Sequence, residues 1–361
     1  MKTTYVIAEA GVNHNGSLRM ALELIDAASE VGADAVKFQT FRADKVAAPY
    51  VGKARYQLQD DQPGESQQAM LRALELSEEM HDRLAEHCRK RGIAFMSTPF
   101  DPDSAARLSS KYAVPFLKIA SGELTNAPLL LAVARSKLPA ILSTGMSTLG
   151  EVEDALGVLA YGYLDDEGER PAPSAQAFRD AYISDEGQRV LKSRVTLMHC
   201  TTEYPAAFEE ANLRMMDTLA CAFQLPVGYS DHTPGIAIPI AAAARGAHVL
   251  EKHLTLDRRL PGPDHAGSLE PSELAEMIRA IRSVDKALGS QVKRPVASEI
   301  ANLEAVRRSI VAAVPIRAGE TYTVHNLTVK RSGRGISPMK YFDLLGEKAN
   351  RNYEPDERIR I

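Results

Sequence analysis

The chain has 361 residues, of which 45% are hydrophobic and 25% charged, with a formal net charge of −4 at pH 7. This length predicts one large globular domain and a smaller one. The small negative charge gives no electrostatic attraction to nucleic acid or to an anionic membrane, so neither is expected as a partner. The N-terminus lacks signal-peptide features, no apolar stretch approaches the roughly 20 residues of a membrane span, and the three cysteines are widely spaced. We therefore expect a cytoplasmic protein without disulfides.

Eight short apolar runs recur in the first 260 residues, and amphipathic stretches separate them. The runs are TTYVIAE, ADAVKF, GIAFMS, VPFLKI, LPAILS, VTLMHC, LPVGYS and AHVLEKH. The predicted helices are 18–31, 78–91, 102–111, 127–135, 149–161, 212–223, 235–245 and 271–288. Strict alternation over about 250 residues predicts an α/β fold, a (β/α)8 TIM barrel. The competing doubly wound sheet needs a GxGxxG loop after its first strand, and GVNHNG does not match.

Two stretches interrupt this alternation, and the pattern changes near the end of the chain. Residues 50–77 are polar and follow the second strand, which favours a lid over a barrel active site. Residues 163–193 are charged and contain prolines, which predicts a surface excursion. We expect a catalytic barrel over 1–288, a linker over 289–305 and a small α+β module over 306–361. So small a module is more stable when docked, for which a barrel mouth is the candidate surface.

Polar side chains follow almost every apolar run, at the ends that converge on one face of a barrel. Lys37 and Lys118 belong to this set, and an unpaired lysine inside a strand is costly. Two lysines beside several hydroxyl groups form an oxyanion site, most naturally for a phosphate.

His232 and His253 come from adjacent strands and form a minimal metal-ligand set, with Asp264 nearby. Two imidazoles need waters, a carboxylate or substrate oxygens to complete an octahedral shell, which favours Mn2+ or a similar divalent ion over a closed zinc site. For His14 and His199 we expect a core or supporting role.

Two carboxylates and one thiol also fall at strand ends. Glu9 and Glu123 are candidates for a general base and for an acceptor of substrate hydroxyl groups, or else for lysine counter-ions, and spacing does not separate these roles. Cys200 is expected to be a buried small side chain rather than a nucleophile.

Several motifs together resemble the sialic acid synthase family, which includes the N-acetylneuraminate and legionaminate synthases. They include AEAGVNHNGS, VKFQTF, LKIASGELTN, GYSDHTPG, EKHLTLDRRLPGPDHAGSLEP and VKRSGRG, and the likeness covers nearly the whole chain. The resemblance implies condensation of phosphoenolpyruvate with an open-chain N-acetylmannosamine-type sugar, giving a nine-carbon 2-keto sugar acid and phosphate. It also implies a divalent metal, usually Mn2+ with Mg2+ or Co2+ as alternatives, and a C-terminal SAF (antifreeze-like) domain.

The resemblance assigns roles residue by residue. It implies that the metal ligands are His232 and His253. It implies that the phosphoenolpyruvate site is Lys37, Thr98, Lys118, Ser121, Ser143 and Ser230. It implies catalytic roles for Glu9, Lys37, Lys118 and His253, with Glu9 handling the attacking water. It implies that the sugar site is Gln39, Glu123, Tyr204, Asp264 and Arg331. Arg331 matches an arginine that one subunit lends to the other, which implies a domain-swapped homodimer.

Two departures and several alternatives stay open. Thr202 stands where some family members have Asn, and Ser332 replaces a usual proline, so contacts near both are in doubt. The acceptor sugar is open among N-acetylmannosamine, its 6-phosphate form and 2,4-diacetamido-2,4,6-trideoxymannose, the substrate of an N,N'-diacetyllegionaminate synthase. Competing functions are a Schiff-base barrel aldolase and a non-catalytic carbohydrate-binding protein.

Overall fold

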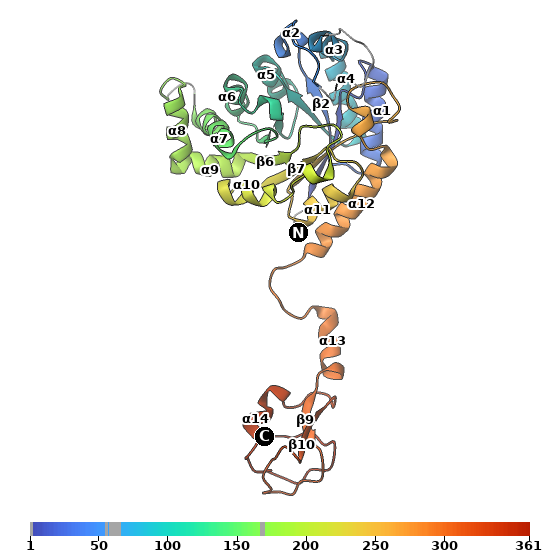
Figure 1. Ribbon diagram of the computed structural model, residues 1–361, viewed down its shortest axis with the longest axis vertical. Coiled ribbons are helices and arrows are strands. Elements are labelled where there is room, and N and C mark those ends of the chain that lie inside the picture. The colour runs from blue at the N-terminus through green and yellow to red at the C-terminus, as the bar shows by residue number, and fades with distance from the viewer. Residues whose placement is uncertain (1–2, 55–56, 58–65, 167–169) are drawn as a thin grey trace. The chain divides into compact units, whose positions relative to one another are not determined.

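The computed structural model describes residues 3–54, 57, 66–166 and 170–361, which form two compact units (Figure 1). The units are Met1–Gly289 and Ser290–Ile361. No helix among the described residues is both long enough and apolar enough to span a bilayer.

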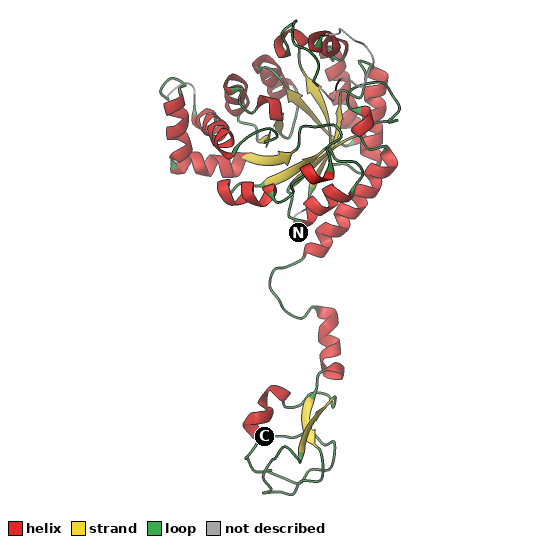
Figure 2. Cartoon of the chain, viewed as in Figure 1, coloured by secondary structure: helices red, strands yellow, loops and turns green. Residues whose placement is uncertain are grey.

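The first unit is a parallel sheet wrapped by helices, with the strands inside (Figure 2). Its strands are β1 (Tyr5–Gly11), β2 (Ala35–Thr40), β3 (Ala94–Pro99), β4 (Leu117–Ile119), β5 (Ala140–Ser143), β6 (Val195–Cys200), β7 (Val227–Asp231) and β8 (Val249–His253). The hydrogen-bonded order is β3-β2-β1-β8-β7-β6-β5-β4, and β3 and β4, at the two ends of this order, also contact each other. The predicted TIM-type barrel is therefore confirmed, and each strand falls on one of the eight apolar runs.

Helices follow the strands and cover the sheet as predicted. They are α1 (Leu18–Glu30), α4 (Glu78–Arg91), α5 (Pro102–Lys111), α6 (Ala127–Arg135), α7 (Leu149–Leu164), α10 (Met215–Phe223), α11 (Ala237–Ala244) and α12 (Pro271–Leu288). Several of these helices have locally encoded starts: the side chain of Ser77 accepts a hydrogen bond from Met80 N, and Thr148 and Glu151 form a capping box. Helix α4 ends at Gly92, whose left-handed φ of 70° suits glycine.

The barrel interior changes from apolar to polar along the strands. Its apolar layer is Ile7, Ala35, Met96, Ile141, Met198 and Val249. Two residues further along each strand lie Glu9, Lys37, Thr98, Ser143, Cys200 and Glu251, all buried. Because side chains two apart in a strand face the same side, one apolar layer supports one polar layer directly above it. The strand period thus places the chemistry at the carboxyl ends of the strands.

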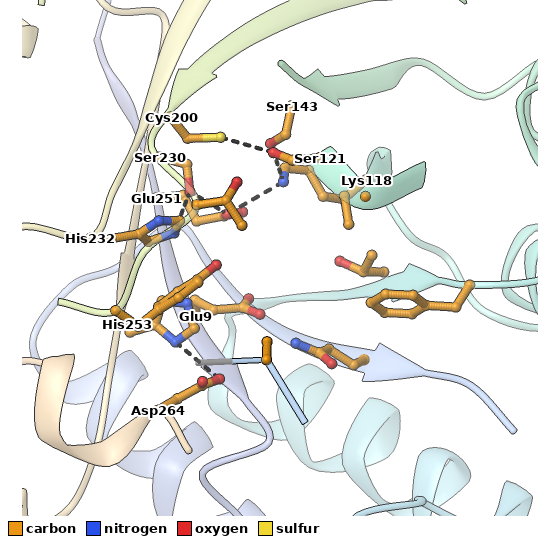
Figure 3. Close-up of a pocket in the computed structure, with 18 of the residues that line it drawn as sticks. Glu9, Lys118, Ser121, Ser143, Cys200, Ser230, His232, Glu251, His253 and Asp264 are labelled. Carbon is orange, nitrogen blue, oxygen red and sulfur yellow. Dashed lines mark hydrogen bonds and ion pairs between the residues drawn. The ribbon is translucent and has the colours of Figure 1, made fainter. Parts of the chain in front are cut away.

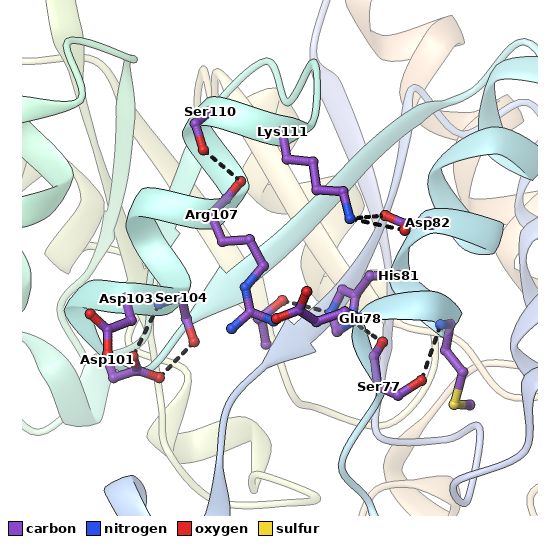
Figure 4. Close-up of polar contacts among 12 residues, drawn as sticks. Ser77, Glu78, His81, Asp82, Asp101, Asp103, Ser104, Arg107, Ser110 and Lys111 are labelled. Atoms are coloured by element: carbon purple, nitrogen blue, oxygen red, sulfur yellow. Dashed lines mark hydrogen bonds and ion pairs between the residues drawn. The ribbon is translucent and has the colours of Figure 1, made fainter.

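Polar contacts join α4 to its neighbours beside the second and third strands (Figure 4). On the surface, Lys111 Nζ lies 2.7 Å from Asp82 Oδ1, and such an exposed pair contributes little stability. Beneath it, Nε2 of the buried His81 lies 2.8 Å from Oγ1 of Thr40, at the end of β2. This buried hydrogen bond anchors the end of the strand that carries Lys37.

The two interruptions of the alternation contain helices. The predicted surface excursion includes α8 (Ala175–Ile183) and α9 (Asp185–Arg194), both packed against α7. Charges and prolines obscure a short apolar face on α8, where Phe178 and Tyr182 contact the core. After β2 come α2 (Ala43–Val46) and α3 (Gln67–Ala73). Residues 55–56 and 58–65, at the centre of the predicted lid, lie outside the described residues.

The second unit has a small core of its own. After α13 (Ala297–Val306), strands β9 (Ser309–Ala312) and β10 (Leu327–Lys330) pair antiparallel, and α14 (Tyr341–Leu344) follows. Its buried side chains include Ile310, Ile316, Tyr322, Leu327, Leu344, Tyr353 and Ile359.

Candidate active site

The carboxyl ends of the barrel strands open into a cavity of about 500 Å³ (Figure 3). The predicted site residues that line it are Glu9, Lys37, Gln39, Thr98, Lys118, Ser121, Ser143, Tyr204, Ser230, His232, His253 and Asp264. Glu123 is not part of the lining; it lies on the short helix η2 (Ser121–Glu123), where its Oε2 accepts a hydrogen bond from Asn126 at 2.7 Å. Arg331 follows β10 in the second unit.

Glu251, in the middle of β8, is shared by both predicted lysines. Its Oε2 lies 3.5 Å from Lys37 Nζ, and its Oε1 lies 3.4 Å from Lys118 Nζ. Ser230 Oγ donates a hydrogen bond of 2.9 Å to the same Oε1. Burial opposes ionisation, but the two ammonium groups outweigh it and hold the pKa of Glu251 below its usual range. Glu251 is therefore an ionised counter-ion for two buried cations.

Glu9, on β1, contacts only one of these lysines. Its Oε2 lies 2.7 Å from Lys37 Nζ. Burial raises the pKa of Glu9 to about 7, although Lys37 acts in the opposite direction. Burial would lower the pKa of Lys37, but the carboxylates of Glu251 and Glu9 outweigh it and raise that pKa. Two carboxyl groups whose pKa values are pushed apart are typical of acid–base sites.

Hydroxyl groups surround the two ammonium groups. Lys37 Nζ donates to Thr98 Oγ1 at 2.9 Å, and Lys118 Nζ donates to Ser143 Oγ at 2.6 Å. Both lysines are buried, so their charges act in a medium that screens them poorly. Ammonium and hydroxyl groups in this arrangement provide donors for the oxygens of a bound anion.

Gly145 lets the backbone lie close to these hydroxyl groups. Gly145 N donates to Ser121 Oγ at 3.1 Å, and a Cβ at position 145 would lie only 2.7 Å from that oxygen and 2.5 Å from Thr202 Oγ1. Thr202 Oγ1 is buried and has no hydrogen-bond partner among the described residues. Cys200 is buried as expected, and its Sγ lies 3.0 Å from Ser121 Oγ in the cavity wall. Any side chain at position 145 would displace these groups.

The two histidines lie together in the cavity wall, with ring centroids 5.6 Å apart. His232 Nδ1 lies 2.5 Å from the carbonyl oxygen of Thr201, which assigns the proton to Nδ1 and leaves Nε2 as an acceptor. Burial lowers the pKa of His232 to about 4 and that of His253 well below its usual value. Both rings are therefore neutral at physiological pH, the form that binds metals.

The residues around the histidines fit a divalent cation. His253 Nδ1 is buried without a hydrogen-bond partner among the described residues, 3.7 Å from Asp264 Oδ2. Gly11, at a φ of +50°, keeps this corner open, since a Cβ there would lie 3.3 Å from Glu9 Oε1 and 3.5 Å from Asp264 Oδ2. Within the described ranges, no three His, Cys, Asp or Glu side chains form a complete ligand set. A divalent ion held by the two imidazoles would need further oxygens from water or substrate to complete its shell.

The remaining aromatic and histidine predictions divide between cavity and core. The Tyr204 ring lines the cavity, with its centroid 4.1 Å from that of His232. His199 Nε2 bonds the carbonyl of Ala211 at 2.8 Å, outside the lining. His14 Nδ1 accepts from a backbone N–H of its own loop, and burial lowers the pKa of His14 to about 4. Neither of these two histidines faces the cavity, in line with a supporting role.

Two kinds of cavity residue received no role from the sequence. Glu251 carried a signal, since it stands two residues before His253 and so faces the same side of β8. Phe41 and Phe100 carried none, because aromatic residues just beyond a strand are ordinary core candidates. In contrast, Lys252 faces away from the cavity and forms a buried pair with Asp231.

Comparison with known proteins gives consistent results along the whole chain. The NeuB family model matches residues 24–293, and the SAF domain model matches residues 307–361. The N,N'-diacetyllegionaminic acid synthase of Campylobacter jejuni is 46% identical over 360 residues, which cover 100% of both chains. The enzyme of the same name from Legionella pneumophila is 43% identical, covering 97% of this chain and 91% of its own. The solved structure of the N-acetylneuraminic acid synthetase of Leptospira borgpetersenii superposes with a TM-score of 0.66 at 34% identity, covering 83% of this chain and 90% of that one.

Proposed function

Because the chain belongs to the NeuB family and ends in a SAF domain, we propose that it is a phosphoenolpyruvate-dependent sialic acid synthase. The proposed reaction joins phosphoenolpyruvate, water and an open-chain N-acetylated mannosamine-type sugar into a nine-carbon 2-keto sugar acid and phosphate. One observation carries the proposal: two buried lysines that share Glu251 line the same cavity as two neutral imidazoles.

In the proposed reaction, C3 of the enol forms a bond to the aldehyde carbon of the sugar. Water then adds at C2, and the tetrahedral intermediate expels phosphate as the C–O bond of phosphoenolpyruvate breaks. Lys37 and Lys118 hold the phosphoryl group, and the hydroxyl groups of Thr98 and Ser143 complete its donors, while Ser230 holds Glu251 between the lysines. Fixed donors of this kind stabilise the charge of a leaving group because they need not reorganise during the reaction.

Glu9 is placed to handle the proton of the attacking water. With a pKa of about 7, its carboxyl group can accept and release a proton near neutral pH. Lys37, 2.7 Å away, keeps the ionised form accessible inside the barrel. General-base catalysis by a positioned carboxylate contributes about 10²- to 10⁴-fold in rate.

His232 and His253 would hold the divalent cation, for which we propose Mn2+. When bound, the cation supplies Lewis-acid polarisation of the sugar aldehyde. The hydrogen bond from His232 Nδ1 to the Thr201 carbonyl fixes that ring and presents Nε2 to the ion.

The acceptor sugar would be held by Gln39, Tyr204 and Asp264, which line the same cavity, with Glu123 next to Gly122 of the lining. We propose that Arg331 completes this site from the partner subunit of a domain-swapped homodimer, because no hydrogen bond or ion pair engages its side chain within the described second unit. A cytoplasmic location fits soluble substrates of this kind.

The test is to incubate the protein with phosphoenolpyruvate, Mn2+ and a panel of N-acetylated hexosamines while measuring released phosphate. Phosphate release that depends on both the sugar and the metal supports the proposal. Turnover without metal, combined with covalent trapping of substrate by borohydride, identifies a Schiff-base aldolase instead. N,N'-diacetyllegionaminate synthesis is the second candidate within the family, favoured by the two Campylobacter and Legionella relatives.

A further inference from the structure

The turn between β5 and α7 carries a methionine in a backbone conformation that side chains rarely adopt. Met146 has a φ of 63°, in the left-handed region, where a Cβ comes too close to the following carbonyl oxygen. Ser147 N donates to the carbonyl oxygen of Thr144 at 3.3 Å, so Gly145 and Met146 are the two central residues of a β-turn. Glycine or asparagine is usual at the second central position when its φ is positive. Met146 therefore keeps a large side chain where the backbone disfavours one.

Burial does not offset this strain in the free protein. The side chain of Met146 is 71% exposed, although it lines the active-site cavity. The other hydrophobic side chains in the described lining, such as Phe41 and Phe100, are buried or half-buried. An apolar side chain in water gains nothing from the hydrophobic effect. A strained and exposed apolar residue at a cavity therefore indicates a contact that the free chain lacks.

The turn places Met146 at the end of the cavity that holds Lys118. Ser143, three residues earlier in the chain, accepts the hydrogen bond of 2.6 Å from Lys118 Nζ. Gly145, directly before Met146, donates to Ser121 Oγ at 3.1 Å. The side chains of Lys118, Ser121 and Ser143 lie together in Figure 3. A ligand held by these ammonium and hydroxyl groups is thus the nearest candidate for the missing contact.

We propose that Met146 closes over phosphoenolpyruvate bound at Lys118 and contacts it directly. The inference rests on the proposed function, which identifies the bound anion. Methionine suits this role because its unbranched chain and polarizable sulfur adapt to irregular shapes. The thioether would cover the methylene group, the apolar part of phosphoenolpyruvate, and displace water from the phosphoryl oxygens. Ion pairs are screened less when water is excluded, so this cover strengthens the pairs between the lysines and the anion.

Oxidation of methionine to its sulfoxide measures the contact directly. Dilute hydrogen peroxide oxidises exposed methionines in the full-length protein, and mass spectrometry of peptides follows each one separately. With phosphoenolpyruvate at 100 times its dissociation constant, nearly every site is occupied, so oxidation of Met146 should slow by about tenfold or more. Met215 is 49% exposed and lies outside the cavity lining, so its oxidation rate should not change.

Matched variants separate the contact from the backbone strain. Met146→Gly relieves the strain, so its unfolding midpoint should rise by about 2 °C. The same variant lacks the side chain, so its dissociation constant for phosphoenolpyruvate should rise by about tenfold, the lower end of what burial of one apolar side chain contributes. Met146→Leu keeps an apolar side chain of similar volume and should bind within about threefold of wild-type protein. Gln224→Gly relieves a φ of 53° after α10, outside the cavity, and should leave binding unchanged.

The salt dependence of binding gives a second measurement. In Met146→Gly, water and salt ions reach the lysine–phosphoryl pairs, so the dissociation constant should rise more steeply with potassium chloride than in wild-type protein. Gln224→Gly should follow the wild-type dependence. Loss of a merely structural contact would weaken binding without changing this slope.

The outcomes separate this inference from the proposed function. If calorimetry detects no binding of phosphoenolpyruvate to wild-type protein, the proposed function is wrong and the inference falls with it. If phosphoenolpyruvate binds but Met146 is oxidised equally fast with and without it, the synthase stands and Met146 makes no contact. Slow oxidation of Met146 without ligand would show that another copy of the chain covers it, which also overturns the inference. Equal dissociation constants for Met146→Gly and wild-type protein would do the same.

Discussion

Replacing Glu251 with glutamine removes the one carboxylate that both active-site lysines share, while preserving the size of the side chain. The lost partners are Lys37 Nζ at 3.5 Å and Lys118 Nζ at 3.4 Å. Ser230 can still donate its hydrogen bond of 2.9 Å to the amide oxygen. Glu251→Gln therefore tests charge compensation with little change in packing.

The magnitude follows from the geometry. At an effective dielectric constant of about 20, each of the two ion pairs is worth about 5 kcal/mol before desolvation. Removing the carboxylate also removes its own cost of burial, so the net loss in the free energy of unfolding should be about 3 to 5 kcal/mol, as for other buried pairs that lose one partner. Inorganic phosphate replaces the missing negative charge, so its dissociation constant should fall by about tenfold or more in the variant.

The assay is thermal unfolding of wild-type and variant protein over a series of phosphate concentrations. Ligand at 100 times its dissociation constant adds about 2.7 kcal/mol of stability, so tighter binding appears as a larger phosphate-dependent rise in the unfolding midpoint. Asp231→Asn is the matched control: it removes the partner of Lys252, 2.5 Å away, in a buried pair that does not line the cavity. Phosphate should not rescue this control. Equal phosphate-dependent rises in Glu251→Gln and wild-type protein would refute the shared-counter-ion argument.

Three further predictions address the site. His253→Ala should abolish phosphate release and weaken Mn2+ binding measured by calorimetry; near-normal rates in metal-replete buffer would remove the metal assignment. In metal-free protein, the pKa of Glu9 is about 7 in the folded state and 4.5 in the unfolded state. Between these two pH values the folded state therefore binds more protons than the unfolded state. Stability should therefore be lost as pH rises from about 4.5 through 7, by about 3 kcal/mol in denaturant titrations relative to Glu9→Gln, and parallel pH profiles would contradict this. Truncation after about residue 290 should leave a folded barrel with little activity. Co-expressed Arg331→Ala and His253→Ala chains should regain roughly a quarter of the wild-type rate, because half of the dimers then hold one intact site of two. A fully active truncation or an inactive mixture would argue against a lent arginine.

Most of the fold could be predicted because its signals are local. A strand of a parallel barrel is buried on both faces, so it is an apolar run, and most of the helices that follow have a side-chain cap and an apolar face. The helices α8 and α9 were not predicted because their local signals are weak. Their apolar faces are short, and the charged and proline-rich residues around 164–174 dominate the pattern.

The candidate site was partly predictable, because polar residues at strand ends are visible in the sequence while their neighbours across the barrel are not. Lys37 and His253 could be found by position alone. That Glu9 lies level with His253 depends on the register between the first and last strands, which only closure of the barrel sets. The direction of Lys252 follows from strand alternation, yet its partner Asp231 comes from the adjacent strand.

The opposite states of Glu9 and Glu251 show what the sequence does not contain. Both are buried carboxyl groups in one layer of the barrel, and burial alone would protonate both. Glu251 ionises because two ammonium groups reach it, whereas Glu9 has one, which it shares with Glu251. Below pH 7 the cluster of Lys37, Lys118, Glu9 and Glu251 therefore carries one net positive charge, which favours a phosphoryl anion. As that anion binds, its negative charge opposes ionisation of Glu9, and a Lys37 that pairs with the anion stabilises the Glu9 carboxylate less. Anion binding and ionisation of Glu9 therefore oppose each other, and Glu251, which has the second lysine, stays the ionised member of the pair.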